Sequence, residues 1–261
     1  MAEKIERLTF WAAPLLALQF LTRIPVPLVA RLSPEVVKIG LGRAVGWFPL
    51  VGALVGCITA LMVTLCDEFW PRTVAVVLAL IIEARLTGAF HEDAVADFCD
   101  AFGGGWTRDD TLRIMKDSRI GSYGALGLTL AVALRAALMI TLSPAALVIS
   151  IVAAATAGRL LVVLLMASAP PAAVSSGLTK DIGARVEWPQ YVPAILLSAP
   201  ILVVWCQQMP RAALLALALS ITFLVWFRAL LMRRLGGSTG DCLGFAAYAG
   251  QLIVLLTATL K

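Results

Sequence analysis

Residues 145–168 read AALVISIVAAATAGRLLVVLLMAS, an apolar run that contains a single charged side chain, Arg159. A helix needs roughly 20 predominantly apolar residues to cross about 30 Å of hydrocarbon. The run therefore predicts a membrane-spanning helix. Arg159 lies too deep in it to be an idle surface charge, so we expect this side chain to face the interior of a helix bundle.

Apolar runs of similar length recur along the rest of the chain. The candidate spans are 44–66, 73–90, 124–142, 145–168, 191–208, 211–232 and 243–260. A shorter run at 8–22 either spans the membrane, lies in its interface or re-enters it. The sequence thus predicts an all-α, polytopic integral membrane bundle of about 7–8 transmembrane helices, built as a single membrane-embedded domain over residues 1–261.

The composition agrees with this fold class. Hydrophobic residues make up 61% of the chain and charged residues 14%, whereas soluble domains carry about 25% charged residues. The net charge of +5 indicates basic loops that face anionic lipid headgroups. No clustered basic stripe with exposed aromatics is present, so we expect no binding of nucleic acid. The five scattered cysteines predict neither a disulfide framework nor a zinc site.

Four longer polar connections separate the spans, at 23–43, 91–122, 169–190 and 233–242. They hold the basic residues Arg23, Arg31, Lys38, Arg43, Arg108, Arg113, Lys116, Arg119, Lys180, Arg185, Arg233 and Arg234. The alternate turns hold only Arg72 and Arg211. Because positively charged loops stay on the cytoplasmic side, we expect all four connections to face the cytoplasm.

One of these connections is unusually acidic. Residues 87–105 read TGAFHEDAVADFCDAFGGG, and they contain four carboxylates. If 83–101 is one continuous helix, then Asp93, Asp97 and Asp100 fall within an arc of roughly 60°. Such a stripe predicts a site for Mg²⁺ or Mn²⁺, which prefer hard oxygen ligands. The alternative is a solvated acidic face, which we disfavour because ionisable groups beside a membrane helix are usually functional.

Other residues of this stretch lie off the aspartate stripe. His91, the only histidine, is a general base, a group that supports the aspartates, or simply a helix-start residue. We expect Glu92 to be solvated. Gly103–Gly105 would either cradle a phosphate through backbone N–H groups or form a plain turn.

Basic residues follow in TRDDTLRIMKDSRIGSYGALG, residues 107–127. Thr107 and Asp110 resemble a capping box, which predicts a helix from about Arg108 to Arg119. This helix would present Arg113, Lys116, Asp117 and Arg119. A basic helix beside a carboxylate stripe suits phosphoryl transfer, because metal and cations share the charge of a diphosphate. An ion pair between Arg113 and Asp117 is the purely structural alternative.

A further acid begins the last span. The stretch RRLGGSTGDCLG, residues 233–244, places Asp241 at the start of the final helix. Asp is common at helix N-caps, so Asp241 is either a cap or part of a site.

Four stretches occur together in a characteristic order: LQFLTRIPVP (18–27), the acidic stretch 87–105, IMKDSRIGSYGALGL (114–128) and the stretch 233–244. Together they resemble the cobalamin synthase family, from about residue 10 to the C-terminus. The resemblance implies a polytopic enzyme of a prokaryotic inner membrane, with its active site facing the cytoplasm. Such an enzyme joins α-ribazole, or its 5′-phosphate, to adenosylcobinamide-GDP and releases GMP, with Mg²⁺ required.

The resemblance also implies roles for the candidate residues. Asp93, Asp97 and Asp100 would hold Mg²⁺. The diphosphate oxygens would be neutralised by Arg23, Lys116, Arg119 and Arg159. A ribose hydroxyl would attack the phosphorus that bears cobinamide, and the groups that would orient or deprotonate it are His91, Asp117 and Asp241.

The chain departs from the family pattern at a few positions. Glu92 replaces an apolar residue, Ala94 replaces a glycine, and Tyr248 and Gln251 stand where relatives carry glutamates. We expect the change at Glu92 to be harmless, and the last helix to hold no metal through Tyr248 or Gln251.

Two other functions are less consistent with these motifs. A CDP-alcohol phosphatidyltransferase also uses an aspartate cluster at a membrane face, but DAVADFCD (93–100) lacks the glycine and arginine of that signature. A cation or proton transporter would place its acids near the bilayer midplane on broken helices, whereas here they cluster in one connection and at helix ends.

Overall fold

A computed structural model describes residues 2–172 and 190–260. The helices are α1 (Ala2–Leu21), α2 (Pro34–Ala44), α3 (Phe48–Asp67), α4 (Arg72–Thr87), α5 (Phe90–Gly104), α6 (Arg108–Met115), α7 (Ser122–Thr141), α8 (Pro144–Ser168), α10 (Val192–Gln208), α11 (Pro210–Arg234) and α12 (Gly240–Ala258). Short 3₁₀ turns lie at Val29–Arg31 and Val45–Trp47. Within the described ranges the regular structure is helical, apart from one bridge between Pro171 and Ser238. The predicted all-α bundle is confirmed.

The number of spans is lower than the sequence predicts. In the described chain five helices are long and apolar enough to cross a membrane, or six if α4 and α5 count as one bent span. Two of the predicted spans correspond to shorter apolar helices, Trp11–Leu21 and Val192–Gln208. The prediction of about seven or eight spans is therefore somewhat too high, although the protein is a multi-pass membrane bundle.

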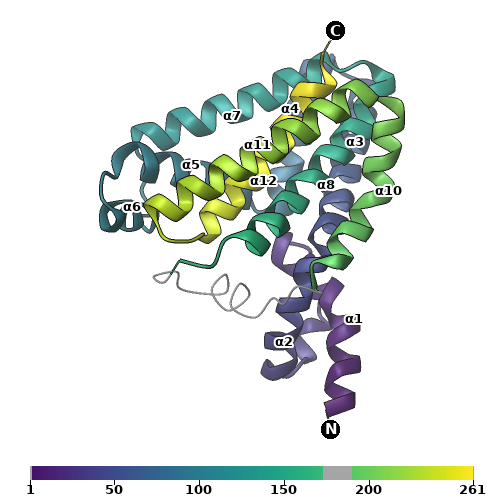
Figure 1. The fold of residues 1–261 in the computed structure, drawn as a ribbon. Coiled ribbons are helices and arrows are strands. Elements are labelled where there is room, and N and C mark those ends of the chain that lie inside the picture. The colour runs from purple at the N-terminus through teal and green to yellow at the C-terminus, as the bar shows by residue number, and fades with distance from the viewer. Residues whose placement is uncertain (1, 173–189, 261) are drawn as a thin grey trace.

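Helix α8 lies at the centre of the bundle and packs against α3 and α12 (Figure 1). The helices approach closely where small residues face each other. A Cβ atom on Gly52 of α3 would lie 2.5 Å from the carbonyl oxygen of Ala155, and one on Gly158 of α8 would collide with the carbonyl oxygen of Ala247. Tight packing around α8 therefore fixes how α12 and its acidic first turn are placed.

The chain bends by 89° between α4 and α5, so the expectation of one helix over 83–101 is wrong. Gly88 (φ 75°) and Ala89 (φ 56°) both adopt left-handed backbone conformations that end α4. A side chain at Gly88 would collide with the guanidinium of Arg23, whose backbone N–H donates to the carbonyl oxygen of Leu86. The end of α1 is thereby attached to the bend. The three aspartates all follow the bend, on α5.

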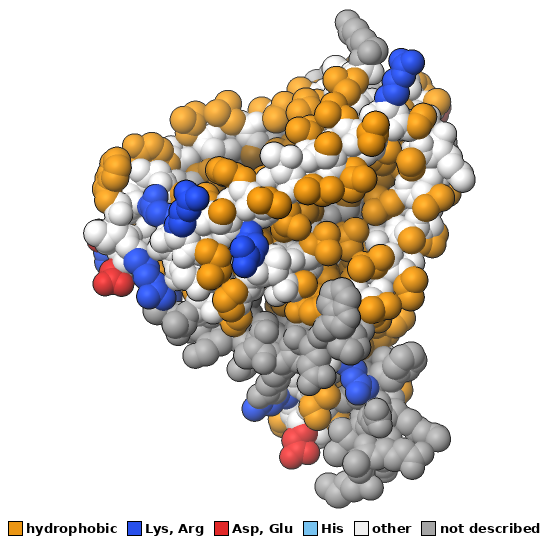
Figure 2. Space-filling model, viewed as in Figure 1, with side chains coloured by type: hydrophobic (Ala, Val, Ile, Leu, Met, Phe, Trp, Pro, Cys, Tyr) orange, Lys and Arg blue, Asp and Glu red, His pale blue; other side chains and the backbone are white. Residues whose placement is uncertain are grey.

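The polar connections differ in their structure. Most of the connection 91–122 is helical in α5 and α6, and the predicted helix from about Arg108 to Arg119 corresponds to the shorter α6. Of 169–190, residues 173–189 lie outside the described chain, and the predicted cytoplasmic Lys180 and Arg185 lie among them. Residues 169–172 of this connection contact the connection 233–242, because the backbone N–H of Ala172 donates to the carbonyl oxygen of Ser238 (2.9 Å). The surface over α11 and α10 is largely hydrophobic (Figure 2), as expected for helices that face lipid.

Candidate active site

Four carboxylates come together where α5 packs against the start of α12. A Cβ atom on Gly244 of α12 would collide with the side chain of Ala94 on α5, so the two helices are in close contact one turn from Asp241. Helix α5 leaves the end of α4 at an angle of 89°. Burial, followed by the charges of Asp93, Asp241 and Asp100, raises the pKa of Asp97 to about 7. Asp241 therefore belongs to the same electrostatic cluster as the α5 stripe.

Asp241 is not the N-cap of α12. The cap is Thr239, whose hydroxyl oxygen accepts a hydrogen bond from the backbone N–H of Cys242 (3.3 Å). Threonine at this position satisfies one of the free N–H groups at a helix start. The cap interpretation of Asp241 is therefore wrong, and its carboxylate is available for other contacts near Asp93 and Asp97.

Asp100 has a different environment from the rest of the stripe. Its two carboxylate oxygens accept hydrogen bonds from the backbone N–H groups of Gly121 (2.6 Å) and Gly124 (2.8 Å). These groups lie at the start of α7, where free N–H groups and the helix dipole favour a negative charge. Asp100 thus ties α5 to α7, and both of its oxygens are engaged by the backbone.

The basic segment after α5 forms a shorter helix than expected. Thr107 caps α6 as predicted, accepting a hydrogen bond from the N–H of Asp110 (3.1 Å), but α6 ends at Met115 rather than Arg119. Lys116 is its C-cap. Arg113 pairs with Asp110 at 3.5 Å. The predicted ion pair between Arg113 and Asp117 is therefore wrong.

Asp117 pairs instead with Arg119, with 2.6 Å between carboxylate and guanidinium. Hydrogen bonds from the side chain and backbone of Arg119 lower the pKa of Asp117 to about 2. Asp100, Asp117 and Arg119 line one open depression of about 460 Å³, together with Gly121 and Ser122. The structure thus brings part of the basic segment next to the last aspartate of the stripe.

Arg23 lies at a separate depression, of about 500 Å³, beside the bend between α4 and α5. Its neighbours there include Arg85, Gly88 and Ala89. Arg23 is therefore close to the start of α5, whereas Arg119 lies near its end.

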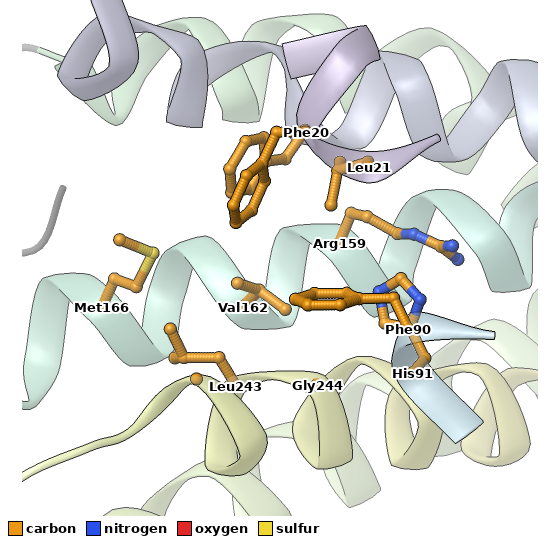
Figure 3. A pocket seen from close by; sticks show the side chains of 11 residues that line it. Phe20, Leu21, Phe90, His91, Arg159, Val162, Met166, Leu243 and Gly244 are labelled. Carbon is orange, nitrogen blue, oxygen red and sulfur yellow. The ribbon is translucent and has the colours of Figure 1, made fainter. Parts of the chain in front are cut away.

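His91 and Arg159 line a small cavity inside the bundle (Figure 3), with Phe20 and Phe90 on its wall. Its volume is about 30 Å³, which is the space of one water molecule. The prediction that Arg159 faces the interior is confirmed, because its side chain is 1% exposed. Its Nη1 donates to the carbonyl oxygen of Ala155 (3.4 Å), while its buried Nε has no partner among the described residues. Such a cation is costly to bury, and the nearby carboxylates of Glu83 and Glu92 offset part of this cost.

A buried ion pair beside this cavity was not predicted from the sequence. One Nη nitrogen of Arg135 lies 2.9 Å and 2.7 Å from the two carboxylate oxygens of Glu83, and Thr59 donates to the same carboxylate at 2.7 Å. The other Nη lies 3.8 Å from Glu92. Glu92 is therefore packed inside the bundle and is not solvated. It replaces an apolar residue of the family pattern, and its carboxylate has Arg135 as its partner. The available signal was Glu83 in the run 73–90, which also holds Arg85, and the single charge Arg135 in the run 124–142.

The last helix, α12, adds side chains to the polar cluster of Glu83, Glu92 and Arg135. The ring of Tyr248 lies 5.6 Å from the guanidinium carbon of Arg135. Gln251 is 1% exposed, and its Oε1 has no partner among the described residues. Neither residue is a carboxylate that would bind a metal. Both instead contribute polar atoms to the interior beneath the aspartates.

The aspartates do not form a ready-made metal cluster. Within 2–172 and 190–260, no three His, Cys, Asp or Glu side chains are grouped closely enough to hold one ion as they stand. The donor chemistry is nevertheless that of a hard divalent cation, since Asp93, Asp97 and Asp241 offer carboxylate oxygens. Burial and the neighbouring carboxylates together raise the pKa of Asp97, and a bound cation would offset both effects.

Comparison with known proteins gives consistent matches over nearly the whole chain. The chain is 36% identical over 248 residues to the adenosylcobinamide-GDP ribazoletransferase of Ralstonia pickettii (strain 12J), which covers 94% of each protein. It is 36% identical over 244 residues to the enzyme of that name from Shewanella pealeana, covering 92% of each. A 121-residue part is 54% identical to the Shewanella amazonensis enzyme, covering 46% and 45%. No solved structure matches.

The family comparison has the same extent. The family model described as cobalamin-5-phosphate synthase matches residues 13–259, which include every element from the end of α1 to the end of α12. This range contains the acidic helix α5, the basic segment after it and the first turn of α12. By this match and by the full-length relatives, the chain belongs to the cobalamin-5-phosphate synthase family.

Proposed function

We propose that this protein is an adenosylcobinamide-GDP ribazoletransferase. It joins α-ribazole, or its 5′-phosphate, to adenosylcobinamide-GDP in the assembly of the cobalamin nucleotide loop, and it releases GMP. The observation that carries the proposal is the match to an enzyme of that name over 94% of both chains. The grouping of acidic and basic side chains at one end of the bundle supports it, because transfer from a diphosphate needs both.

The reaction is a displacement at phosphorus. An oxygen of the ribose hydroxyl forms a bond to the phosphorus that bears cobinamide, and the bond from that phosphorus to the oxygen of GMP breaks. The hydroxyl proton passes to a base. GMP leaves with the electron pair of the broken bond, so its phosphate needs positive charge nearby.

The chain offers four cations for the phosphates. Arg119 and Lys116 follow α6 beside the depression at Asp100, Arg23 lies at the start of α5, and Arg159 is inside the bundle. Arg159 has a buried Nε without a partner among the described residues, but its cavity has the space of only one water molecule, so a phosphate would reach it only if the cavity widened. A phosphate oxygen would supply the missing acceptor.

Mg²⁺ is the cofactor that we propose. Asp93, Asp97 and Asp241 would hold it, since both oxygens of Asp100 are already engaged by backbone N–H groups. When bound, the ion would share the negative charge of the diphosphate and of the leaving GMP.

Three groups were candidates for orienting or deprotonating the hydroxyl. Asp117 is the weakest base of them, because Arg119 lowers its pKa to about 2. Its pairing holds Arg119 in place instead. His91 is 3% exposed at the start of α5 and lines the cavity with Arg159, while Asp241 lies in the acidic cluster. We therefore assign the positioning of the hydroxyl to His91 or Asp241.

We also propose that the protein lies in the inner membrane of a prokaryote with this site facing the cytoplasm. Arg23, Lys116, Arg119, Arg233 and Arg234 belong to the connections at the end of the bundle that holds the aspartates. Arg72 and Arg211 lie in the turns at the other end. This asymmetry is the one that the positive-inside rule describes.

The direct test is an assay of the purified protein in lipid vesicles with adenosylcobinamide-GDP and α-ribazole. We expect GMP and a complete corrinoid to form in equal amounts, and only when Mg²⁺ is present. Activity with a CDP-activated lipid alcohol instead would support the phosphatidyltransferase alternative. Cation flux without GMP release would support a transporter.

A further inference from the structure

A narrow apolar groove runs along the outside of the bundle between α8, α10 and α11, on the hydrophobic face shown in Figure 2. Its volume is about 390 Å³. Leu161 and Trp205 form its floor and are 4% and 3% exposed, whereas the α11 side chains Leu214, Leu217 and Ile221 form a wall and are 72%, 59% and 54% exposed. The groove is thus a hollow in the lipid-facing surface that the protein's own helices do not fill.

The dimensions of the groove restrict what it can hold. Its α11 wall extends from Pro210 to Leu224, which is about 21 Å along the axis at about 1.5 Å per residue. A groove of about 390 Å³ over that length is long and narrow. This shape suits an extended hydrocarbon chain.

One end of the groove carries a positive charge. The groove lining ends at Leu224 on α11 and at Leu164 on α8, and Arg228 and Ser168 lie one helical turn beyond these residues. Arg228 and Ser168 meet there, since Nε of Arg228 donates to the carbonyl oxygen of Ser168 at 2.7 Å. Arg228 is exposed, and its other guanidinium nitrogens have no partner among the described residues. This cation therefore lies just beyond the end of the groove that is nearer to the aspartates.

We propose that the groove is a binding site for an anionic phospholipid. One acyl chain lies along α11 from Leu224 towards Pro210, and the phosphate pairs with the guanidinium of Arg228. Water would not fill such a hollow, because apolar cavities stay dry. An empty groove would forfeit the dispersion contacts of its walls. Arginine at the end of a membrane helix extends towards the headgroup level, where it binds phosphate in a bidentate manner.

The acyl-chain half of the site is tested by filling the groove. Ser220 lines it, so Ser220→Trp would occupy the space of the chain. Thr222 is exposed on α11 and does not line the groove, so Thr222→Trp adds the same side chain elsewhere. Native mass spectrometry of each protein, titrated with dioleoylphosphatidylglycerol in detergent, measures the bound lipid. We expect at least a 10-fold weaker affinity for Ser220→Trp and no change for Thr222→Trp.

The headgroup half is tested with Arg228→Gln, with Arg233→Gln as the control that removes an equal charge from the end of α11. Arg228→Gln should lose the preference for phosphatidylglycerol over uncharged dioleoylglycerol, whereas Arg233→Gln should keep it. Lipid binding that is equal in the wild type, Ser220→Trp and Arg228→Gln would overturn the proposal. So would a wild-type dimer that Ser220→Trp converts to a monomer, because the occupant would then be a second copy of the chain.

A measurement on the unaltered protein covers the case in which a variant does not fold. Phosphatidylglycerol with a photoreactive group in the middle of one acyl chain is added to the wild-type protein and illuminated. We expect the crosslinks to map to Trp205–Cys206 and to Leu214–Ile221. Crosslinks spread evenly over all lipid-facing helices would contradict a specific site.

Discussion

Asp97 and Asp100 lie one turn apart on α5, yet their carboxylates have different surroundings. Burial, followed by the charges of Asp93, Asp241 and Asp100, raises the pKa of Asp97, while Asp100 accepts two backbone hydrogen bonds from the start of α7. At the residue scale, Asp97 is therefore a proposed metal ligand, whereas Asp100 is a structural residue. The two variants Asp97→Asn and Asp100→Asn therefore probe different properties.

We predict that Asp97→Asn lowers the rate of GMP release by about 10²–10³-fold, the usual effect of losing one group that stabilises a transition state, with no loss of thermal stability. Asp100→Asn should lower the free energy of unfolding by about 0.5–2 kcal/mol, because an amide nitrogen cannot accept the second N–H. Steady-state kinetics and thermal unfolding in detergent measure both. Equal stability losses in the two variants would contradict this division.

At the start of α12, the capping residue Thr239 and the charged residue Asp241 are likewise two different side chains. Thr239 is the cap, so Thr239→Ala should cost about 0.5–2 kcal/mol of stability and Thr239→Ser should restore it. Asp241→Asn should leave the unfolding temperature unchanged and abolish most of the activity, since its negative charge faces the stripe. Full activity of Asp241→Asn would remove this residue from the site, which α5, the 105–122 segment and Arg23 would then form alone.

At the scale of elements, the bend between α4 and α5 decides where the aspartates point. Arg135 on α7 contacts both sides of it, with Glu83 on α4 at 2.7 Å and Glu92 on α5 at 3.8 Å. Gly88 and Ala89 allow the bend through their left-handed backbone. We infer that the ion pairs hold the angle that the backbone permits.

We predict that Arg135→Leu destabilises the protein by about 3–5 kcal/mol, because it leaves the Glu83 carboxylate buried without the cation that pairs with it. Glu83→Leu combined with Arg135→Leu should recover much of this loss, since no lone charge then remains on that pair. Thermal unfolding of the single and double variants in one detergent measures the coupling. A double variant that is less stable than either single variant would rule out this account.

The helices themselves could be predicted from the sequence with small errors. The runs 145–168 and 211–232 correspond to α8, Pro144–Ser168, and α11, Pro210–Arg234. One continuous apolar run identifies each of these helices without knowledge of its neighbours. The bend at Gly88 could not be predicted in this way, because apolar residues continue on both sides of it. The partners of Arg135 and Arg159 depend on which helices meet in space, which no local pattern contains.

At the scale of the whole molecule, α11 extends from one membrane face to the other. Arg234 at its end donates to the carbonyl oxygen of Gly105 at 2.5 Å, which places the segment after α5 at that end. Pro210, at its start, directly follows α10. The 25 residues of α11 extend about 36 Å at about 1.5 Å per residue, enough to cross the hydrocarbon layer. Residues near Gly105 and near Gln208 therefore lie on opposite sides of the membrane.

The last prediction uses this separation to test the orientation. Trp106 is 89% exposed and is a better labelling position than Thr107, which caps α6. In a protein whose accessible cysteines (Cys57, Cys66, Cys99 and Cys206) are replaced by serine, a new cysteine at Trp106 should react only with membrane-permeant maleimides in intact cells. A cysteine at Gln208 should also react with impermeant ones, because the positive-inside rule predicts that the other face, which holds the basic connections, is cytoplasmic. Permeabilised cells, in which both positions react, provide the control. The reverse pattern would place the aspartates outside the cytoplasm, away from the supply of nucleotide-activated substrates, and would contradict the proposed function as well as the topology.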